Sequence, residues 1–498
     1  MPERLEITQD CLNPPLEQSI EYDKPHEECG VVGIIKRKET ENIAQRIGDG
    51  LQTIQHRGQE AAGVAVGVGT DKVMALKDVG LVAIALGGNK LSGLPKGKVA
   101  VGHVRYGTID THTPEEAFEA AGPSLAEGSK GTIAIGLNGN LLNINDLVAE
   151  FGVDADEHVT DCSAATAAVA AAREHCDSLA EAAVMVFSKA KEAFTVVVMG
   201  EGQLIGIRDP FGFRPLMLGT YPNDGGYAMA SETPALKTMG ASYRREISRG
   251  EMVVCDQDGT LTSSYPFQEK PSKLCAFEFI YFSAPHAQLE GRSIKKVRTE
   301  MGRILAAEHP VEADIVVGVP ESGLPAAEGY SLASGIPLVA AFAKNRYIGR
   351  TFIIPGQESR EDGVERKLQV IGSEVYMKRL VLIDDSMIRG TTSKKIVAML
   401  LEEGALEVHL RLTSAPYKWP CFYGMDTRKP EELIANQIPD LRELKEYLGV
   451  TSLAYLSLAG LRAATADAAG KLCTACMDGN YPTPIYFSEG KATNRPPK

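Results

Sequence analysis

The chain has 498 residues, enough for two or three domains, and its 44% of hydrophobic and 23% of charged residues are typical of a globular protein. Its net charge of −13 at pH 7 and the lack of a long basic run argue against a nucleic-acid partner. No apolar stretch is long enough to span a membrane, and residues 1–28 lack the apolar core of a secretory signal, so we expect a cytoplasmic protein without a membrane partner.

The first half of the chain is expected to combine sheets with helices. A polar leader over residues 1–28 precedes a compact apolar run at 30–35, where the first strand should begin. Apolar residues recur at helical spacing over 40–56, and further helices are predicted near 145–151 and over 162–190. Glycine-rich turns separate short strands predicted at 61–68, 99–106, 132–137, 194–199, 204–208 and 227–231. This arrangement indicates an α+β fold of stacked sheets.

After about residue 275 the pattern changes to alternating helices and strands, which is typical of an α/β fold with a parallel sheet. Helices are predicted at 293–309, 323–334 and 392–403, and strands at 314–319, 337–343, 379–383 and 407–412. A polar stretch over 345–366 is too long for an ordinary loop in a compact domain, so we interpret it as a functional lid. A helical tail at about 430–447 precedes a cysteine-containing C-terminus.

Cys29 lies where the polar leader meets the first predicted strand, in the segment ECGVVGI at 28–34. A lone cysteine is more often a small buried core residue than a catalytic one. The alternative is that removal of residues 1–28 makes Cys29 the N-terminal residue. Its own α-amine, with a pKa of about 8, would then serve as general base for its thiol. The motifs that follow favour this second interpretation.

Five short motifs follow Cys29 in order: HRGQEAAG at 56–63, GHVRYGT at 102–108, NGN at 138–140, DPFGFRPL at 209–216 and ASE at 230–232. Together with Cys29 they resemble the class II, N-terminal-nucleophile glutamine amidotransferases over about residues 29–260. The resemblance implies an αββα sandwich (the Ntn fold) and a glutaminase site with Cys29 as nucleophile. Leu137 and Gly107 depart from the His and Ser that are usual in the family. Because neither position supplies the nucleophile or an oxyanion donor, we expect the mechanism to survive both departures.

The same resemblance implies roles for individual residues. Arg105 would hold the glutamine α-carboxylate through a bidentate contact, Asp161 would bind the α-ammonium group, and Thr108 would also contact glutamine. The Asn138 amide and the Gly139 backbone N–H would form the oxyanion hole. Each residue also has an ordinary structural explanation, because Asn-Gly is a common hairpin turn and exposed Arg and Asp side chains often form surface ion pairs.

A second candidate centre is the segment RLVLIDDSMIRGTTS at 379–393. An apolar strand ends in Asp384 and Asp385, and a Gly/Thr/Ser loop then begins a helix. Backbone N–H groups and hydroxyls at a helix start can hold a phosphate, and paired carboxylates suit ribose hydroxyls and Mg²⁺. A solvated acidic turn with an N-capping threonine would explain single residues of the segment but not the whole assembly.

This segment resembles the signature of type I phosphoribosyltransferases, and the second half is similar to the glutamine phosphoribosylpyrophosphate amidotransferase family. The residues PESG at 320–323 match the pyrophosphate loop, and KNRYIGRTF at 344–352 begins the flexible loop. The resemblance implies that Ser322, Asp384 and Asp385 hold Mg²⁺. It implies phosphoribosyl pyrophosphate contacts for Lys344, Arg350, Lys367, Asp384, Asp385, Arg389, Gly390, Thr391, Thr392 and Ser393. Without the resemblance, the basic residues would read as a solvated loop.

The two resemblances together imply an enzyme that converts phosphoribosyl pyrophosphate, glutamine and water into 5-phosphoribosylamine, glutamate and pyrophosphate, the first step of purine synthesis. They also imply a homo-oligomer, either a dimer or a tetramer, that is inhibited by purine nucleotides. The alternatives are a regulator that binds phosphoribosyl pyrophosphate without turnover, and a class II amidotransferase with another acceptor domain. The predicted parts are a propeptide (1–28), a glutaminase domain (29–260), a phosphoribosyltransferase domain (261–445) and a C-terminal tail (446–498).

Four of the nine cysteines are candidate metal ligands. Cys473 and Cys476 form a C-x₂-C pair, which alone is compatible with zinc, a redox pair or a core position. Cys275 and Cys421 can complete a four-thiolate site, and the chemistry of four thiolates does not separate Zn²⁺ from an iron–sulfur cluster. The surrounding sequences, CAFEFIYFS at 275–283 and PCFYGMD at 420–426, resemble the branch of the family that carries a structural [4Fe–4S] cluster and a cleaved propeptide.

Overall fold

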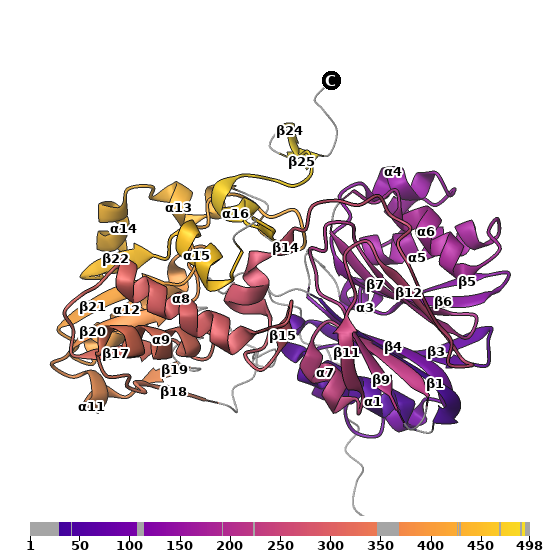
Figure 1. Cartoon of the computed structure of the whole chain (residues 1–498), viewed down its shortest axis with the longest axis horizontal. Helices are drawn as coiled ribbons and strands as arrows, with labels where there is room; N and C mark the ends of the chain where they lie inside the picture. Colours follow the sequence, from indigo (N-terminus) through magenta and orange to yellow (C-terminus); the bar gives the residue numbers. More distant parts are fainter. Residues whose placement is uncertain are drawn as a thin grey trace, which may run out of the picture.

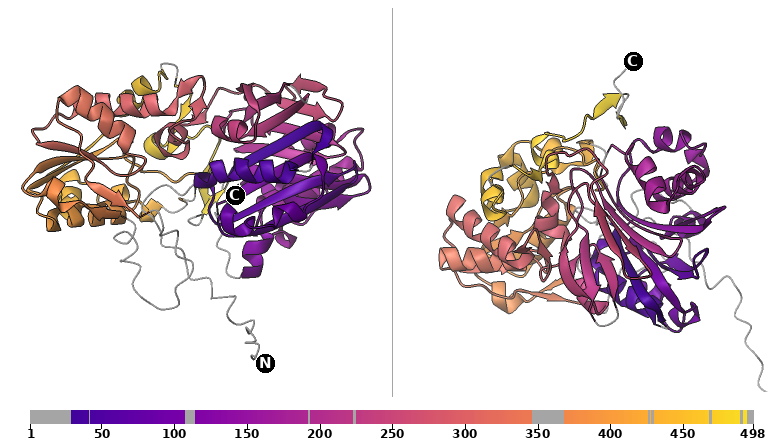
Figure 2. Two further views of the ribbon diagram at one scale, coloured as in Figure 1. Left: turned by 90° about the horizontal axis from the view of Figure 1, so that it is seen from below. Right: turned by 45° about the vertical axis from the view of Figure 1, so that its right-hand side comes forward.

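A computed structural model describes residues 29–40, 42–106, 114–191, 193–222, 225–345, 368–425, 427, 430–467, 470–488 and 491–493. The predicted leader and nearly all of the predicted lid lie outside these residues. The chain forms two bodies that lie side by side, the N-terminal one in indigo to magenta and the C-terminal one in orange to yellow (Figure 1, Figure 2). Within the described residues, no helix combines the length and apolar character needed to cross a membrane.

One sheet of the N-terminal body has seven antiparallel strands. In sheet order they are β11 (Ser242–Glu246), β9 (Met217–Tyr221), β10 (Gly226–Ala230), β1 (Gly30–Thr40), β4 (Gly97–Arg105), β2 (Ala61–Val68) and β3 (Lys72–Val79). Helix α1 (Ile43–Thr53) packs on its outer face through Ile47 and Leu51, and α7 (Thr233–Thr238) lies beside α1. Gly102 of β4 permits this close packing, because a Cβ there would lie 2.4 Å from Ile47.

The second sheet has six antiparallel strands. In sheet order they are β13 (Leu261–Ser264), β12 (Met252–Asp256), β8 (Gln203–Arg208), β7 (Phe194–Gly200), β6 (Gly131–Gly139) and β5 (Ser124–Gly128). Helices α4 (Ile144–Ala149), α5 (Asp161–Arg173) and α6 (Leu179–Phe187) cover its outer face. The segment predicted as helical over 162–190 is two helices, because Ser178 caps a new helix start by accepting from the Glu181 N–H.

The two sheets face each other across a layer of buried side chains that includes Val31, Val101, Ala134 and Val197. Residues that alternate with them point to the helices, as the two-residue period of a strand requires. The N-terminal body is therefore a helix–sheet–sheet–helix sandwich, which confirms the predicted αββα architecture.

The C-terminal body is built on a parallel sheet with helices on both faces. Its strands are β17 (Ile315–Gly318), β20 (Arg379–Asp384), β21 (Glu407–Leu412) and β22 (Ser452–Tyr455). The helices that pack with it are α8 (Ile294–Glu308), α9 (Leu324–Ser334), α12 (Thr391–Glu402), α14 (Leu441–Leu448) and α15 (Leu458–Ala464). This body confirms the predicted α/β part of the fold.

One predicted strand of this body differs from the structure. Of the segment 337–343, only the beginning runs along β17, where the Val316 N–H donates to the Pro337 carbonyl and the Val339 N–H donates to the Val316 carbonyl. The chain then leaves the sheet edge and forms β18 (Phe342–Lys344), which pairs with β19 (Leu368–Val370) in a separate antiparallel ribbon. The expected strand is thus divided between two pairings.

A network of buried charges joins the two bodies. Arg57, whose side chain is fully buried, donates through Nε to Glu232 at 2.5 Å and through Nη1 and Nη2 to Glu278 at 3.1 and 2.5 Å. Glu278 begins the wide helical turn Glu278–Phe282 that leads into the C-terminal body. Ala284, which follows this turn, also contacts the N-terminal body, because its N–H donates to Glu232 at 3.0 Å. Burial raises the pKa of Glu278, but the charge of Arg57 outweighs it and holds the pKa below its ordinary value.

We expect Glu278→Leu to destabilise the protein by about 3 kcal/mol, because it leaves Arg57 buried with one carboxylate partner fewer. The midpoint of thermal unfolding, measured by calorimetry at one scan rate, should fall by several degrees. Glu269, which pairs with Arg249 at 2.8 Å on the surface, provides the matched control. Glu269→Leu should leave the midpoint unchanged, since exposed ion pairs contribute little. Equal midpoints for the two variants would contradict the importance of the buried network.

Candidate functional site

The first group of candidate functional side chains lies near the end of β4, on the face of the strand that points between the two sheets. On β4, Val99 and Val101 face the core between the two sheets. Because side chains alternate along a strand, His103 and Arg105 follow on the same face. Both are nearly as buried as the core, with 5% and 4% of their surface exposed. The open end of the sandwich is therefore lined by polar groups that water barely reaches.

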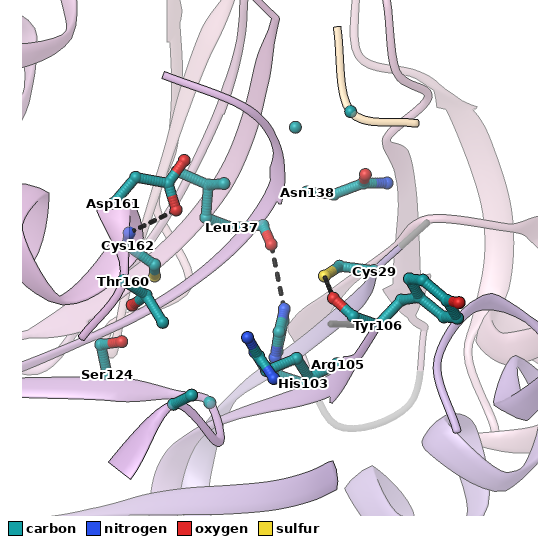
Figure 3. A pocket seen from close by; sticks show the side chains of 14 residues that line it. Cys29, His103, Arg105, Tyr106, Ser124, Leu137, Asn138, Thr160, Asp161 and Cys162 are labelled. Carbon is teal, nitrogen blue, oxygen red and sulfur yellow. Dashed lines mark hydrogen bonds between the residues drawn. The ribbon is translucent and has the colours of Figure 1, made fainter. Parts of the chain in front are cut away.

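The same period places groups from both sheets at this end. Val31 of β1 faces the core between the sheets, so Cys29, two residues earlier, lies at the end of that face. Ala134 of β6 also faces this core, and Asn138 lies four residues further on. Cys29, Asn138 and Arg105 thus come from three different strands or strand ends and line one pocket (Figure 3).

The predicted glutaminase residues meet in this pocket, since Cys29, Arg105, Asn138, Gly139 and Asp161 all line it. Thr108, the other predicted glutamine contact, lies outside the described residues, as does Gly107. The convergence joins residues that are more than one hundred positions apart in the chain. It is the geometry that the motif order predicted.

Cys29 lies at the pocket wall with its Sγ 3.8 Å from the carbonyl oxygen of Tyr106. Burial raises the pKa of the Cys29 thiol to about 11, although the hydrogen bond to Tyr106 and the charge of Arg105 oppose the shift. The thiol is therefore protonated at neutral pH in the chain as it stands. A nucleophilic role requires a base that accepts this proton.

Two charged groups of the pocket are oriented by backbone and side-chain contacts. Arg105 forms an ion pair with Glu60, with Nη1 at 2.5 Å from the carboxylate. Gly58 of the HRG motif packs directly against β4, because a Cβ there would lie 2.7 Å from the Arg105 carbonyl. Asp161 begins helix α5, and its carboxylate accepts from the N–H groups of Leu141 and Cys162 at 3.0 and 2.8 Å.

Asn138 and Gly139 have the features of an oxyanion hole. Among the described residues, both polar atoms of the buried Asn138 amide lack a hydrogen-bond partner. Gly139 has φ +143°, and a Cβ there would lie 2.1 Å from the Ala193 carbonyl, so this position requires glycine. An unpaired buried amide is costly unless a ligand completes its hydrogen bonds. The Asn138 amide is thus available to a developing negative charge.

The residues that line the pocket without having been predicted as site residues include His103, Cys162 and Gly424. Alternation along β4 would have placed His103 on the same face as Arg105. Cys162 follows Asp161 directly, and its thiol donates to the Ile135 carbonyl at 3.6 Å. Gly424 belongs to the C-terminal half of the sequence, and no local pattern connects it with the glutaminase motifs.

Gly424 reaches the pocket because the segment 422–424 is held against the N-terminal body. The Asn140 side chain donates to the Phe422 carbonyl at 3.1 Å, and Arg214 donates to the Tyr423 carbonyl at 2.5 Å. The Tyr423 ring stacks on Phe213, with 4.3 Å between ring centroids. The second body therefore supplies part of the wall of the glutaminase pocket.

The motif DPFGFRPL at 209–216 explains how these contacts are held in place. The buried Asp209 carboxylate accepts from the N–H groups of Phe211 and Gly212 at 2.8 Å and from that of Phe213 at 3.0 Å. This ordered turn presents Phe213 and Arg214 to the segment 422–424. The motif thus serves the contact between the two bodies.

The predicted magnesium residues also come together. Ser322 follows β17, and Asp384 and Asp385 end β20, which is the parallel neighbour of β17. The Ser322 hydroxyl donates to Asp385, and the Asp385 N–H donates to Asp384 at 2.9 Å. Both carboxylates are almost fully buried. Carboxyl ends of neighbouring parallel strands meet at one edge of a sheet, which accounts for this convergence.

The predicted phosphate loop begins helix α12. Gly390 has φ +79° and precedes the first helical residue, Thr391, whose side chain is exposed, whereas Thr392 and Ser393 are buried. Lys344 lies 3.4 Å from Glu321, next to the predicted pyrophosphate loop. Arg389 forms an ion pair with Glu432 at 3.0 Å. The predicted contacts Arg350 and Lys367 lie outside the described residues.

The four candidate ligand cysteines are buried and come from three chain segments. β14 (Leu274–Cys275) pairs in parallel with β23 (Leu472–Cys473), which sets Cys275 beside Cys473. The N–H groups of Lys418 and Trp419 donate to the Cys476 carbonyl at 2.9 and 3.0 Å, which brings the segment of Cys421 to the same place. Among the described residues, no three His, Cys, Asp or Glu side chains are close enough to hold one metal ion between them.

Two of these thiols have the surroundings of a thiolate ligand. The Tyr423 N–H donates to the Cys421 sulfur at 3.4 Å. Burial raises the pKa of the Cys473 thiol to about 12, against the effect of a backbone hydrogen bond from Ala475. Backbone N–H groups that point at sulfur stabilise its anionic form and are common around metal-bound cysteines. The donor set of four cysteines without histidine is compatible with an iron–sulfur cluster and with zinc.

Comparison with known proteins agrees with this geometry. Residues 86–255 match the family model described as a glutamine amidotransferase domain. The amidophosphoribosyltransferase of Mycobacterium bovis is 42% identical over 474 residues, which cover 93% of this chain and 88% of that protein. A solved structure of the allosteric regulatory enzyme of purine biosynthesis superposes with a TM-score of 0.82 at 38% identity, covering 92% of this chain and 97% of the other. Glutamine phosphoribosylpyrophosphate amidotransferase from B. subtilis, complexed with ADP and GMP, gives a TM-score of 0.81 at 38% identity, covering 92% and 98%.

The αββα sandwich with its cysteine pocket, joined to a parallel-sheet body with a paired-acid loop, defines a glutamine amidotransferase with a phosphoribosyltransferase domain. Identity of 42% over nearly the whole chain extends this assignment beyond the shared fold. The chain belongs to the amidophosphoribosyltransferase family.

Proposed function

We propose that the chain catalyses two coupled reactions: hydrolysis of the glutamine side-chain amide in the N-terminal body and transfer of the released ammonia to phosphoribosyl pyrophosphate in the C-terminal body. The products are 5-phosphoribosylamine, glutamate and pyrophosphate, as in the first step of purine synthesis. The observation that carries the proposal is the convergence of Cys29, Arg105, Asn138 and Asp161 on one pocket. A regulator that only binds phosphoribosyl pyrophosphate would have no use for this pocket.

In the first reaction, the Cys29 sulfur attacks the side-chain carbonyl carbon of glutamine, and the carbonyl oxygen takes the negative charge. The Asn138 amide and the Gly139 N–H stabilise this oxyanion. The carbon–nitrogen bond then breaks, the amide nitrogen takes up the proton that the Cys29 thiol gave up and leaves as ammonia, and water hydrolyses the resulting thioester to glutamate. Arg105 and Asp161 orient the substrate through its α-carboxylate and α-ammonium groups, and Thr108, outside the described residues, would add a contact.

In the second reaction, the nitrogen of ammonia bonds to C1 of the ribose while the bond from C1 to pyrophosphate breaks. The N-terminus of α12, with Arg389, Gly390, Thr391, Thr392 and Ser393, would hold the 5′-phosphate. Ser322, Asp384 and Asp385 would hold Mg²⁺, which when bound neutralises charge on the pyrophosphate leaving group. Lys344 would assist from the pyrophosphate side, as would Arg350 and Lys367, which lie outside the described residues. The burial of the two carboxylates and the contact of Asp385 with Ser322 support this assignment.

We expect Cys29→Ala to lower glutamine-dependent synthesis by at least about 1,000-fold, because no nucleophile remains. Synthesis from added ammonia should continue, since it uses only the C-terminal site. Both rates are measured as pyrophosphate release with glutamine or an ammonium salt. Cys255→Ala, which removes a buried thiol of the sandwich core, is the control and should retain both rates. Parallel loss of both activities in Cys29→Ala would contradict the division of labour.

We also propose that residues 1–28 are a propeptide whose removal frees the α-amine of Cys29. The amine, with an ordinary pKa of about 8, is a suitable base for the thiol. The raised pKa of the Cys29 thiol supports this need for a base.

Intact mass of the glutamine-active protein should therefore match a chain that begins at Cys29. A preparation that retains the leader should react slowly with iodoacetamide at Cys29 near neutral pH, because its thiol pKa of about 11 leaves little thiolate. The reaction rate should rise as the pH approaches that value. If a protein that keeps residues 1–28 were fully active with glutamine, the α-amine of Cys29 could not be the base, and the proposal would be wrong.

The four cysteines Cys275, Cys421, Cys473 and Cys476 are proposed to hold a [4Fe–4S] cluster with a structural role. When bound, such a cluster supplies a covalent tie among the three segments that carry these residues. Support comes from their burial, from the pairing of β14 with β23 and from the backbone N–H contacts to sulfur.

Purified protein should then contain iron and acid-labile sulfide in nearly equal amounts, and Cys473→Ser should lose both together with the broad visible absorbance. Cys176→Ser changes another buried thiol, outside this group, and should retain the metal. Stoichiometric zinc without sulfide would show that the site holds a single ion instead.

Three further features are proposed. Purine nucleotides are expected as inhibitors, since the B. subtilis structure contains ADP and GMP. We also expect a homo-oligomer, a dimer or a tetramer, in the cytoplasm.

A further inference from the structure

Among the residues that the structure describes, the end of strand β6 has a strand neighbour on one side only. The pairing of β5 with β6 reaches from Gly131 to Ile135, where β5 begins at Ser124. β6 continues to Gly139, and in the described part of the chain it pairs there with β7 alone. The residues of the oxyanion hole, Asn138 and Gly139, therefore lie on a strand end that is supported from one side. Such an end needs another support if its donors are to stay in one position.

His103 supplies that support from the opposite sheet. Its Nε2 lies 2.9 Å from the carbonyl oxygen of Leu137, the residue directly before Asn138 (Figure 3). His103 belongs to β4 of the seven-stranded sheet, whereas Leu137 belongs to β6 of the six-stranded sheet. The contact thus crosses the sandwich at the pocket. Both residues are buried, so water competes poorly for the hydrogen bond.

The protonation of His103 follows from its surroundings. A carbonyl oxygen can only accept, so Nε2 carries the hydrogen and donates it to Leu137. Burial lowers the pKa of His103 to about 4, and the ring is therefore neutral near physiological pH. Nδ1 is then an acceptor, and within the described residues it has no hydrogen-bond partner. Gly122, which also lines the pocket, leaves room for the ring, because a Cβ there would lie 2.4 Å from Nδ1.

We propose that His103 is a positioning residue of the glutaminase, which holds the Leu137 carbonyl so that the Asn138 amide and the Gly139 N–H stay directed at the forming oxyanion. The inference rests on the proposed function of Asn138 and Gly139. It assigns His103 no contact with the reacting atoms. The effect should therefore be on the rate of the chemical step and not on glutamine affinity.

This role also accounts for Leu137, where the family usually has histidine. The Leu137 side chain packs in the core beneath helices α5 and α6, on the outer face of the sheet. His103 uses only the backbone carbonyl at this position. A change of side chain at 137 therefore leaves the support of the oxyanion hole intact.

His103→Leu tests the proposal, and His103→Gln, which keeps an N–H donor near the position of Nε2, is its conservative partner. Glutaminase turnover, measured as glutamate release in the presence of phosphoribosyl pyrophosphate, should fall by about 10- to 100-fold in His103→Leu. The KM for glutamine should change little, and His103→Gln should recover most of the rate. His409→Leu removes another buried, hydrogen-bonded histidine, on β21, and should leave glutaminase turnover unchanged.

Synthesis from added ammonia and the thermal unfolding midpoint show whether each variant is folded. If these checks show that His103→Leu is not folded, the proposal is tested with His103→Gln instead. A folded His103→Leu with normal turnover, or a loss confined to KM, would overturn the proposal. So would a His103→Gln protein that is folded but no better than His103→Leu.

A double variant with Asn138→Ala tests the role of His103 separately from the proposed oxyanion hole. If His103 acts through the oxyanion hole, His103→Leu should cost at least about threefold less in the Asn138→Ala background than in the unmodified protein. An equal cost in both backgrounds would show that His103 acts otherwise. If Asn138→Ala itself has normal turnover, the oxyanion hole is wrongly assigned, and the inference falls with it.

Discussion

The glutaminase site depends on the two-residue period of β-strands. At the ends of β1, β4 and β6, Cys29, Arg105 and Asn138 continue the face whose side chains fill the core between the sheets. These polar groups are therefore held in an apolar layer, where unpaired groups are costly and charges are poorly solvated. The same burial keeps the Cys29 thiol protonated and the His103 ring neutral. The fold alone thus sets the protonation states with which the chemistry begins.

A second constraint is that the pocket is incomplete without the C-terminal body. Gly424 closes part of its wall, and the segment 422–424 is held by Arg214 and by stacking of Tyr423 on Phe213. The same segment follows Cys421 directly, so the cysteine group and the glutamine pocket share a short piece of backbone. The buried Arg57–Glu278 pair fixes the bodies at another point. Movement of one body against the other would therefore alter the glutaminase pocket.

The sequence predicted those parts of the structure that depend on local patterns. The strand at 407–412 was predicted with its observed bounds, because its apolar residues alternate with polar ones, as is typical of a strand. The convergence of Cys29, Arg105, Asn138 and Asp161 followed from the order of family motifs. Gly424 was missed because it lies nearly 400 residues from Cys29 in the sequence, and no sequence pattern connects the two segments. The His103–Leu137 contact was missed because it depends on how far β5 extends, which strand patterns do not reveal.

The groups around Cys29 also bear on which base can activate it. Asp161 accepts two backbone N–H groups, and Glu60 is paired with Arg105, so both carboxylates are already engaged by other groups. Burial lowers the pKa of His103 to about 4, and its Nε2 proton is held by Leu137. His103 is therefore poorly matched to a thiol near neutral pH, since efficient proton transfer needs a base with a pKa close to the working pH. An α-amine at Cys29 meets that requirement and is already next to the sulfur, which favours removal of the leader as the step that makes the pocket competent.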